Sequence, residues 1–204
     1  MKLFFSPGAC SLAPHIVLRE AKQAFTLEKV DTGAHKLHDG SDYYAVNSKG
    51  QVPVLEMANG QRLTEGPIIT QYIADQAGRA DLIPVAGSAE RYRVMEWQNF
   101  VTSELHKGYS PLFNKELNDE GKKTLSAVLL KKYGWLDAQL AGKTYLTGDT
   151  FTVADAYLFT VTNWSKFVGL DLSGLKNVQA FMQRVAERPA VREAMAAEGL
   201  LGAK

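Results

Sequence analysis

The sequence predicts an α/β unit followed by an entirely helical unit. Short strand-like and helical patterns alternate over residues 1–80, and no strand signal of comparable quality follows them. Residues 81–88 contain Pro84, Gly87 and Ser88, residue types that interrupt regular structure. We therefore expect an N-terminal domain over residues 1–80, a linker over 81–88 and an all-α domain over 89–204.

The N-terminal domain is expected to alternate strands and helices. Short apolar or alternating runs predict strands at Lys2 to Phe5, Thr26 to Val30, Val54 to Met57 and Gln61 to Leu63. Asn59-Gly60, between the last two, is a strong hairpin signal. Helices are predicted from about Leu12 to Lys22, with Pro14 tolerated in the first turn, and from Pro67 to about Gln76. The order is β-α-β-β-β-α, or β-α-β-α-β-β-α if residues 31–48 hold a short helix.

The second unit is expected to be built from helices alone. They are predicted over residues 89–107, 122–140, 153–167, 176–187 and 190–197. Thr152 and Asp155 resemble a capping box, in which two side chains satisfy the unpaired N–H groups at a helix start, and Phe151 can staple that start. We interpret residues 151–155 as a folding element, because capping explains them fully.

Composition bounds the possible partners. Hydrophobic residues make up 46% of the chain and charged residues 22%, as in ordinary globular proteins. A net charge of +1 offers no strong field for nucleic acid or a membrane surface. Because no segment resembles a signal peptide or approaches ~18 apolar residues, we expect a cytoplasmic protein. The four histidines have no metal-ligand spacing with the cysteine, so a metal is not expected.

Cys10 is the leading candidate for a reactive centre. It is the single cysteine, and it lies where an apolar run ends in a turn and a helical pattern begins. Unpaired N–H groups and the helix dipole at such a place can lower a thiol pKa from about 8.5 toward ~3.5–7.5. The alternative is a small buried hydrophobic residue. Since Ala13 stands where a resolving cysteine would be, no internal disulfide can form.

Two segments of the N-terminal domain can bind a ligand through their backbone. Pro53 before the third strand indicates an edge, a strand start or a cis bond, and Val52 can pair with an extended peptide. A plain rigid turn is the alternative. Glu65 and Gly66 precede Pro67 at a helix start, where N–H groups can take a carboxylate and the Glu65 side chain an ammonium. Compensation of the helix dipole is the alternative there.

The predicted helix from Ala89 has a polar face. Asn99, Ser103 and His106 cluster opposite an apolar stripe, and Lys107 follows at the helix end. His106 can act as a donor or an acid–base group if another surface covers it, and a solvated face is the alternative. His15, within the first helix, is interpreted as structural.

Five motifs in this order resemble the bacterial beta-class glutathione S-transferases, over essentially the whole chain. They are Ser6-Pro7-Gly8-Ala9-Cys10-Ser11, Gly50-Gln51-Val52-Pro53-Val54-Leu55, Leu63-Thr64-Glu65-Gly66-Pro67, Glu104-Leu105-His106-Lys107 and Phe151-Thr152-Val153-Ala154-Asp155. The resemblance implies a thioredoxin-like domain with a four-stranded mixed sheet, followed by an all-α domain.

The resemblance also implies a glutathione site. Val52, after a cis Pro53, pairs with the tripeptide backbone, Glu65 and Gly66 hold the γ-glutamyl end, and Cys10 faces the glutathione sulfur. Gly66 replaces a serine common in the superfamily. A basic side chain after the second strand contacts the ligand, and His35 or Lys36 occupies that region.

The helix completes this site, in part across the interface of a homodimer. The residues implied are Asn99, Ser103, Glu104, Leu105, His106 and Lys107, with His106 catalytic beside Cys10.

The function implied is conjugation of glutathione, as cosubstrate, to hydrophobic electrophiles in detoxification. Cys10 can instead form a mixed disulfide with glutathione, which allows thiol transfer or reductive dehalogenation, and the sequence leaves the nucleophile open. A non-enzymatic regulator of this fold and a glutaredoxin-like reductase are the alternatives. Aromatic residues that can line the electrophile pocket, or else pack in the core, are Tyr109, Phe113, Trp164 and Phe167.

Overall fold

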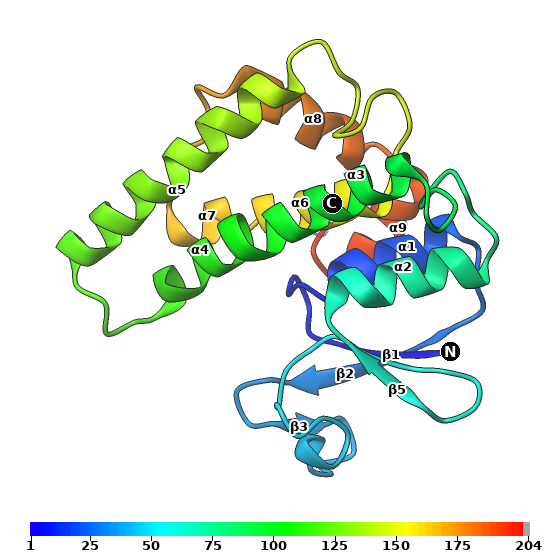
Figure 1. The fold of residues 1–204 in the computed structure, drawn as a ribbon. Coiled ribbons are helices and arrows are strands. Elements are labelled where there is room, and N and C mark those ends of the chain that lie inside the picture. Colours follow the sequence, from blue (N-terminus) through cyan, green and yellow to red (C-terminus); the bar gives the residue numbers. More distant parts are fainter. Residues whose placement is uncertain (202–204) are drawn as a thin grey trace.

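A computed structural model describes residues 1–201 and shows a sheet at one end of the molecule and a larger helical part at the other (Figure 1). The sheet is mixed, with the order β3-β2-β1-β4-β5. β1 is parallel to β2, and the remaining neighbours are antiparallel. The strands are β1 Lys2–Phe5, β2 Thr26–Asp31, β3 Lys36–Leu37, β4 Val54–Glu56 and β5 Arg62–Thr64.

The four predicted strands are confirmed, and the predicted number is corrected from four to five by the short edge strand β3. The Asp31 side chain accepts hydrogen bonds from the N–H groups of Gly33 and Ala34, both at 2.9 Å. These bonds close a tight turn that brings Leu37 opposite Val30. A strand of two residues is too short to give a periodic signal, so the sequence did not predict it.

Successive side chains of β1 point to opposite faces of the sheet, and each face packs against a different part of the chain. Leu3 and Phe5 belong to the main core with α1 (Leu12–Glu20) and α2 (Gly66–Gln76). Phe4 faces the other side and packs on Tyr43, with ring centroids 6.1 Å apart. Tyr43 opens the 3₁₀ helix η1 (Tyr43–Ala45), so the short helix within 31–48 of the second predicted order is present, and β3 before it is the element that this order lacked.

The helical part contains the predicted helices, two of them interrupted. One long helical run consists of α3 (Ala89–Phe100), the π-helix η2 (Val101–His106), α4 (Lys107–Tyr109) and the 3₁₀ helix η3 (Ser110–Phe113). The other helices are α5 Asp119–Leu140, α6 Val153–Thr162, α7 Ser165–Val168, α8 Lys176–Ala186 and α9 Pro189–Ala197. The predicted helix 153–167 is therefore divided into α6 and α7.

The two parts share one core, which lies around α1. This helix contacts α2 on the sheet side and α6 and α9 on the helical side (Figure 1). His15 on α1 is structural, as expected: it is fully buried, and its Nδ1 lies 2.8 Å from Glu198 Oε1. Arg19 donates to the other ring nitrogen at 3.0 Å. The domain division at residues 81–88 stays a prediction, because the main core runs through both parts.

The start of α6 is a buried capping box, as predicted. The Asp155 carboxylate accepts the backbone N–H and hydroxyl of Thr152, both at 2.8 Å, and the Leu146 N–H at 2.9 Å. Burial raises the pKa of this carboxyl to about 6, although these donors act in the opposite direction. At neutral pH the Asp155 carboxyl is therefore ionised, and these hydrogen-bond donors stabilise its buried charge. Phe151 is buried against Tyr145, with ring centroids 5.6 Å apart.

We expect Asp155→Ala to lower the free energy of unfolding by about 2–4 kcal/mol, because three buried donors lose their acceptor. Urea unfolding followed by circular dichroism measures this loss. Asp119→Ala, which removes an exposed carboxylate from the first turn of α5, is the matched control. Equal unfolding free energies for the two variants would contradict the structural role of the capping box.

Candidate functional site

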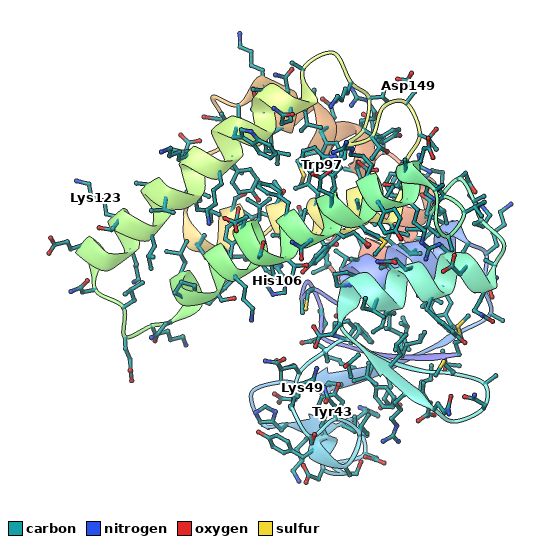
Figure 2. All side chains as sticks on the ribbon, viewed as in Figure 1. Tyr43, Lys49, Trp97, His106, Lys123 and Asp149 are labelled. Atoms are coloured by element: carbon teal, nitrogen blue, oxygen red, sulfur yellow. The ribbon has the colours of Figure 1, made fainter. Side chains whose placement is uncertain are left out.

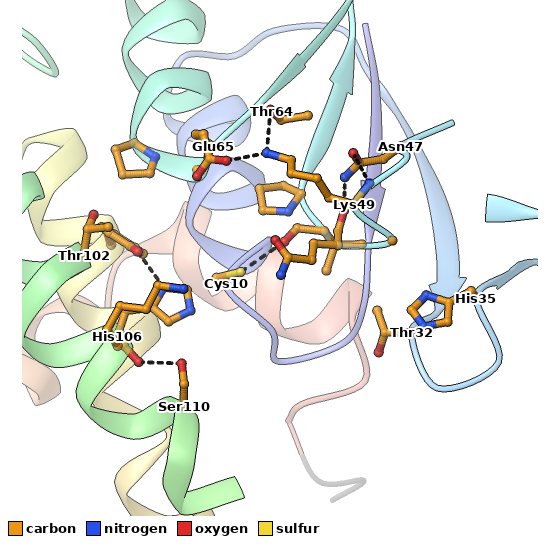
Figure 3. A pocket seen from close by; sticks show the side chains of 18 residues that line it. Cys10, Thr32, His35, Asn47, Lys49, Thr64, Glu65, Thr102, His106 and Ser110 are labelled. Carbon is orange, nitrogen blue, oxygen red and sulfur yellow. Dashed lines mark hydrogen bonds and ion pairs between the residues drawn. The ribbon is translucent and has the colours of Figure 1, made fainter. Parts of the chain in front are cut away.

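A cavity of about 480 Å³ lies between the sheet and the long helical run. Figure 2 shows His106 and Lys49 on its two sides, one from the helical part and one from the sheet part. The N-terminal part contributes Cys10, Thr32, His35, Asn47, Lys49, Gly50, Gln51, Val52, Pro53, Thr64, Glu65, Gly66 and Pro67. The helical part contributes Thr102, His106, Lys107, Ser110 and Tyr157. Both parts are therefore needed to form the cavity (Figure 3).

Most of the predicted site residues come together in this cavity. Those that line it are Cys10, His35, Val52, Pro53, Glu65, Gly66, His106 and Lys107. Those that do not are Asn99, Ser103, Glu104 and Leu105.

Of the predicted polar face, His106 lines this cavity and Asn99 and Ser103 do not, because the helix widens within this face. The Lys107 N–H donates to the carbonyl of Thr102, five residues earlier, which defines a π-helical turn. Thr102, His106 and Ser110 line the cavity as a result, and Asn99 and Ser103 are exposed elsewhere. An expectation based on 100° per residue cannot anticipate such a turn.

Two further predicted residues on this run have other partners within the chain. Glu104 forms an ion pair with Lys132 at 2.9 Å. The Leu105 side chain is fully buried in the core, so it cannot contact a ligand. That Asn99, Ser103 and Glu104 reach the site of a partner subunit stays a prediction.

The environment of Cys10 contradicts the predicted low pKa of its thiol. α1 begins at Leu12, and burial raises the Cys10 pKa to about 11. The backbone N–H groups of Cys10 and Ser11 and the charge of Lys107 lower it, Glu65 raises it, and burial dominates. The thiol is thus protonated at neutral pH, and it donates to the Val52 carbonyl at 3.3 Å.

Val52 presents its backbone to the cavity two residues before β4 begins. The Val52-Pro53 peptide bond is cis, as predicted. Within residues 1–201 the Val52 N–H donates no hydrogen bond, so it is available to an extended ligand. The preceding Gln51 carbonyl is held by the Asn47 amide at 2.7 Å and the Tyr43 hydroxyl at 2.9 Å. These bonds fix the turn that leads to Val52.

Glu65 adopts a left-handed backbone conformation, with φ 70°, at the start of α2. Its side chain does not cap the helix but forms an ion pair with Lys49 Nζ (Figure 3). The Glu65 side chain is therefore not the N-cap of α2, and compensation of the helix dipole by its charge stays the alternative. A Cβ on Gly66 would lie 3.8 Å from Pro53 Cγ, an ordinary contact, so nothing steric forbids a serine there.

His106 is neutral and held by its neighbours. Burial and the adjacent charge of Lys107 lower the pKa of the His106 ring to about 4. Its Nδ1 is hydrogen-bonded to the Tyr157 hydroxyl at 2.6 Å, and the ring meets Trp164 edge-on at a centroid distance of 4.8 Å. Burial also raises the pKa of Tyr157 above its usual value. The pair therefore offers a neutral polar group to the cavity.

His35, rather than Lys36, lines the cavity in the region after β2. Its ring packs on Tyr44 with centroids 4.6 Å apart, and its buried Nδ1 has no hydrogen-bond partner within the described chain. Lys36 lies on β3, away from this wall.

Several lining residues were missed by the sequence reasoning: Thr32, Asn47, Lys49, Gln51, Thr64, Thr102, Ser110 and Tyr157. Lys49 and Gln51 lie within three residues of Val52-Pro53, so their place near that pair was the available signal. The proposed aromatic liners do not line this cavity. Tyr109 and Trp164 are buried, and Phe113 and Phe167 are largely exposed.

No three His, Cys, Asp or Glu side chains among residues 1–201 gather as a metal site would require. None of the helices described combines the length and apolar character needed to cross a membrane.

Comparison with known proteins gives consistent matches. The model of the glutathione S-transferase N-terminal domain matches residues 1–75, and that of the C-terminal domain matches residues 100–189. Glutathione S-transferase GstA of Escherichia coli O157:H7 is 50% identical over 200 residues, which cover 98% of this chain and 100% of the relative.

Solved structures match equally well. The ternary complex of BphK, a bacterial GST, has a TM-score of 0.95 at 50% identity and covers 98% of this chain and 100% of that one. The bacterial beta class enzyme of Sphingomonas chungbukensis has a TM-score of 0.94 at 46% identity, with the same coverage. A sphingomonad glutathione S-transferase complexed with glutathione has a TM-score of 0.94 at 43% identity, again with this coverage.

The raised pKa of Cys10 predicts a distinctive pH profile of alkylation in the protein without added ligand. Only the thiolate reacts, and a pKa of about 11 instead of the usual 9.0 lowers its fraction at pH 7 by about 100-fold. The rate with iodoacetamide, followed by mass spectrometry, should rise about tenfold per pH unit from pH ~7 to ~10 without levelling off. The urea-unfolded chain is the control, with an ordinary thiol. A plateau below pH ~8 in the folded protein would show a low pKa instead.

Proposed function

We propose how glutathione is bound and used by this chain, which belongs to the bacterial beta class of glutathione S-transferases and is a glutathione transferase. The proposal concerns the residues that hold the tripeptide, the reacting sulfur and the second substrate. It rests chiefly on one observation: the Val52 N–H, which has no partner within residues 1–201, the Cys10 thiol and the Glu65 carboxylate line the same cavity.

The three portions of glutathione find complementary groups along this cavity. Its cysteinyl backbone pairs with Val52, as an added strand pairs with an edge. Its γ-glutamyl ammonium meets the Glu65 carboxylate, and the carboxylate beside it meets the first N–H groups of α2 at Gly66. The glycine carboxylate lies toward His35, whose Nδ1 has no partner among residues 1–201. Figure 3 shows Glu65 and His35 on well-separated parts of the wall, as an extended tripeptide requires.

Conjugation to an electrophile is the reaction that the site supports best. With Cys10 protonated, the sulfur that reacts at neutral pH is that of glutathione, which attacks a hydrophobic electrophile and displaces its leaving group. The Cys10 thiol and the positive charge of Lys107 can stabilise the glutathione thiolate by hydrogen bonding and attraction. The neutral His106 and Tyr157 pair offers a further polar contact to the second substrate.

Thiol transfer through Cys10 is the second candidate, favoured by the presence of this thiol in the cavity wall. The Cys10 thiolate attacks a disulfide that contains glutathione, forms a mixed disulfide and releases the other thiolate. A second glutathione then displaces Cys10 and leaves as glutathione disulfide. Because no second cysteine exists in the chain, the resolving thiol must come from glutathione.

The wider setting stays as expected from the family. We propose that the protein is a cytoplasmic homodimer, in which Asn99, Ser103 and Glu104 of one subunit reach the site of the other. The exposure of Asn99 and Ser103 is compatible with such an interface. A non-enzymatic role is set aside, since the chain is a glutathione transferase.

Glu65→Ala should weaken glutathione binding about 10- to 100-fold, because the ligand ammonium loses a charged acceptor. Isothermal titration calorimetry with reduced glutathione measures the dissociation constant. Glu193→Ala is the matched control: the Glu193 carboxylate is 61% exposed and ion-paired with Arg19, and that of Glu65 is 64% exposed. Unchanged affinity in Glu65→Ala would remove this residue from the site.

Cys10→Ala should retain glutathione affinity within about threefold, since Val52 and Glu65 provide most polar contacts. The same variant should lose thiol transfer to a glutathione mixed disulfide, because the attacking sulfur is gone. Coupled assays of conjugation and of thiol transfer separate the two reactions. Thiol transfer at the unmodified rate in Cys10→Ala would rule out the covalent role of Cys10.

A further inference from the structure

Lys49 and Glu65 form an ion pair on the wall of the glutathione cavity. Lys49 Nζ contacts Glu65 Oε1 and also donates to Thr64 Oγ1 at 3.2 Å (Figure 3). Both residues line the cavity, with 46% of the Lys49 side chain and 64% of the Glu65 side chain exposed. The carboxylate expected to receive the ligand ammonium is therefore already occupied by a cation of the protein.

The backbones on both sides of this pair are fixed, and the Lys49 side chain is not. Lys49 N–H and Gly50 N–H donate to the side chain and carbonyl of Asn47, at 3.2 and 2.8 Å, which shapes the turn. Glu65 is held at the start of α2, where its carbonyl accepts the Ile69 N–H at 2.9 Å. The four-carbon side chain of Lys49 can rotate about its single bonds while the backbone stays in place. Breaking an exposed ion pair requires little free energy.

An α-amino acid head group has the charges that this pair can exchange with. It carries an ammonium and a carboxylate on one carbon, so both lie within reach of the same wall. When the ammonium replaces Lys49 at Glu65, the released Lys49 cation can turn to the adjacent carboxylate. One ion pair within the protein then becomes two ion pairs with the ligand, and no charge is left unpaired.

We propose that Lys49 is a specificity-determining residue that selects the complete α-amino acid head group of glutathione by ion-pair exchange with Glu65. A ligand with the ammonium alone must break the Lys49–Glu65 pair and gives Lys49 nothing in return. The inference rests on the proposed function, because it takes Glu65 as the acceptor of the γ-glutamyl ammonium.

The alternative is that Lys49 only competes with the ligand, while the first N–H groups of α2 hold the carboxylate alone, without the Lys49 ammonium. The two possibilities predict opposite effects of removing Lys49 on the affinity for glutathione. A mere competitor weakens every ligand that bears the ammonium, so its removal would strengthen binding of all of them. A residue that exchanges ion pairs weakens binding of the ligand without the carboxylate and strengthens binding of the ligand that has it.

The test compares two ligands on Lys49→Met by isothermal titration calorimetry. Glutathione carries the whole head group, and 4-aminobutanoyl-cysteinylglycine lacks only its α-carboxylate. We expect the variant to bind glutathione about three- to tenfold more weakly and the analogue about two- to fivefold more tightly than the unmodified chain. Lys29→Met removes the same charge from the exposed face of β2, outside the cavity, and should leave both constants unchanged.

Only weaker binding of glutathione together with tighter binding of the analogue supports the ion-pair exchange. If Lys49→Met strengthens both ligands, Lys49 is a competitor; if it weakens both, Lys49 supplies general attraction; and if it changes neither, Lys49 has no role. Each of these results overturns the proposal. Absence of glutathione binding by the unmodified chain would instead overturn the proposed function, so the two failures are distinct. Melting temperatures of the variants confirm that each is folded.

Discussion

The site depends on the anchoring of the loop before Cys10 by the helical part of the molecule. Both backbone groups of Gly8 are used: its N–H donates to Glu198 at 2.9 Å, and its carbonyl accepts the Trp164 indole N–H at 2.8 Å. Glu198 also holds His15 on α1. The residue that leads into Cys10 is thus bonded to groups more than 150 positions away. Since a lone loop has many conformations, these contacts are what place the thiol at the cavity.

The same dependence on distant contacts applies to the opposite wall. The π-helical turn at Val101–His106 brings Thr102, His106 and Ser110 to the cavity, and Tyr157 from the buried helix α6 holds the His106 ring. α6 in turn packs on α1, which begins directly after the Cys10 loop. The two walls are therefore joined through one continuous core, and the cavity is a property of both parts together.

Local chemistry explains which features could be predicted from the sequence. The Thr152 and Asp155 pair is recognisable from its immediate neighbours, so the capping box was predicted correctly from the residues. At Pro53 the residues alone left several possibilities open, and the cis bond was implied by the resemblance to the family. The two-residue strand β3 is too short to leave a pattern. The Cys10 pKa could not be predicted, because helix position is local whereas burial, which dominates, comes from distant parts of the chain. The contact of Lys49 with Glu65 depends on a long flexible side chain, whose direction no spacing specifies.

The charges around the cavity determine whether a sulfur there is ionised or protonated. Without added ligand the Cys10 thiol is protonated, the His106 ring is neutral and Glu65 is compensated by Lys49. Lys107 lowers the pKa of both Cys10 and His106, so its positive field reaches the place where sulfur chemistry occurs. Under the proposed function, a glutathione thiolate in this cavity would meet this field, whereas burial holds the Cys10 thiol in its neutral form. This difference supports the proposal that the reacting thiolate is that of glutathione rather than that of Cys10.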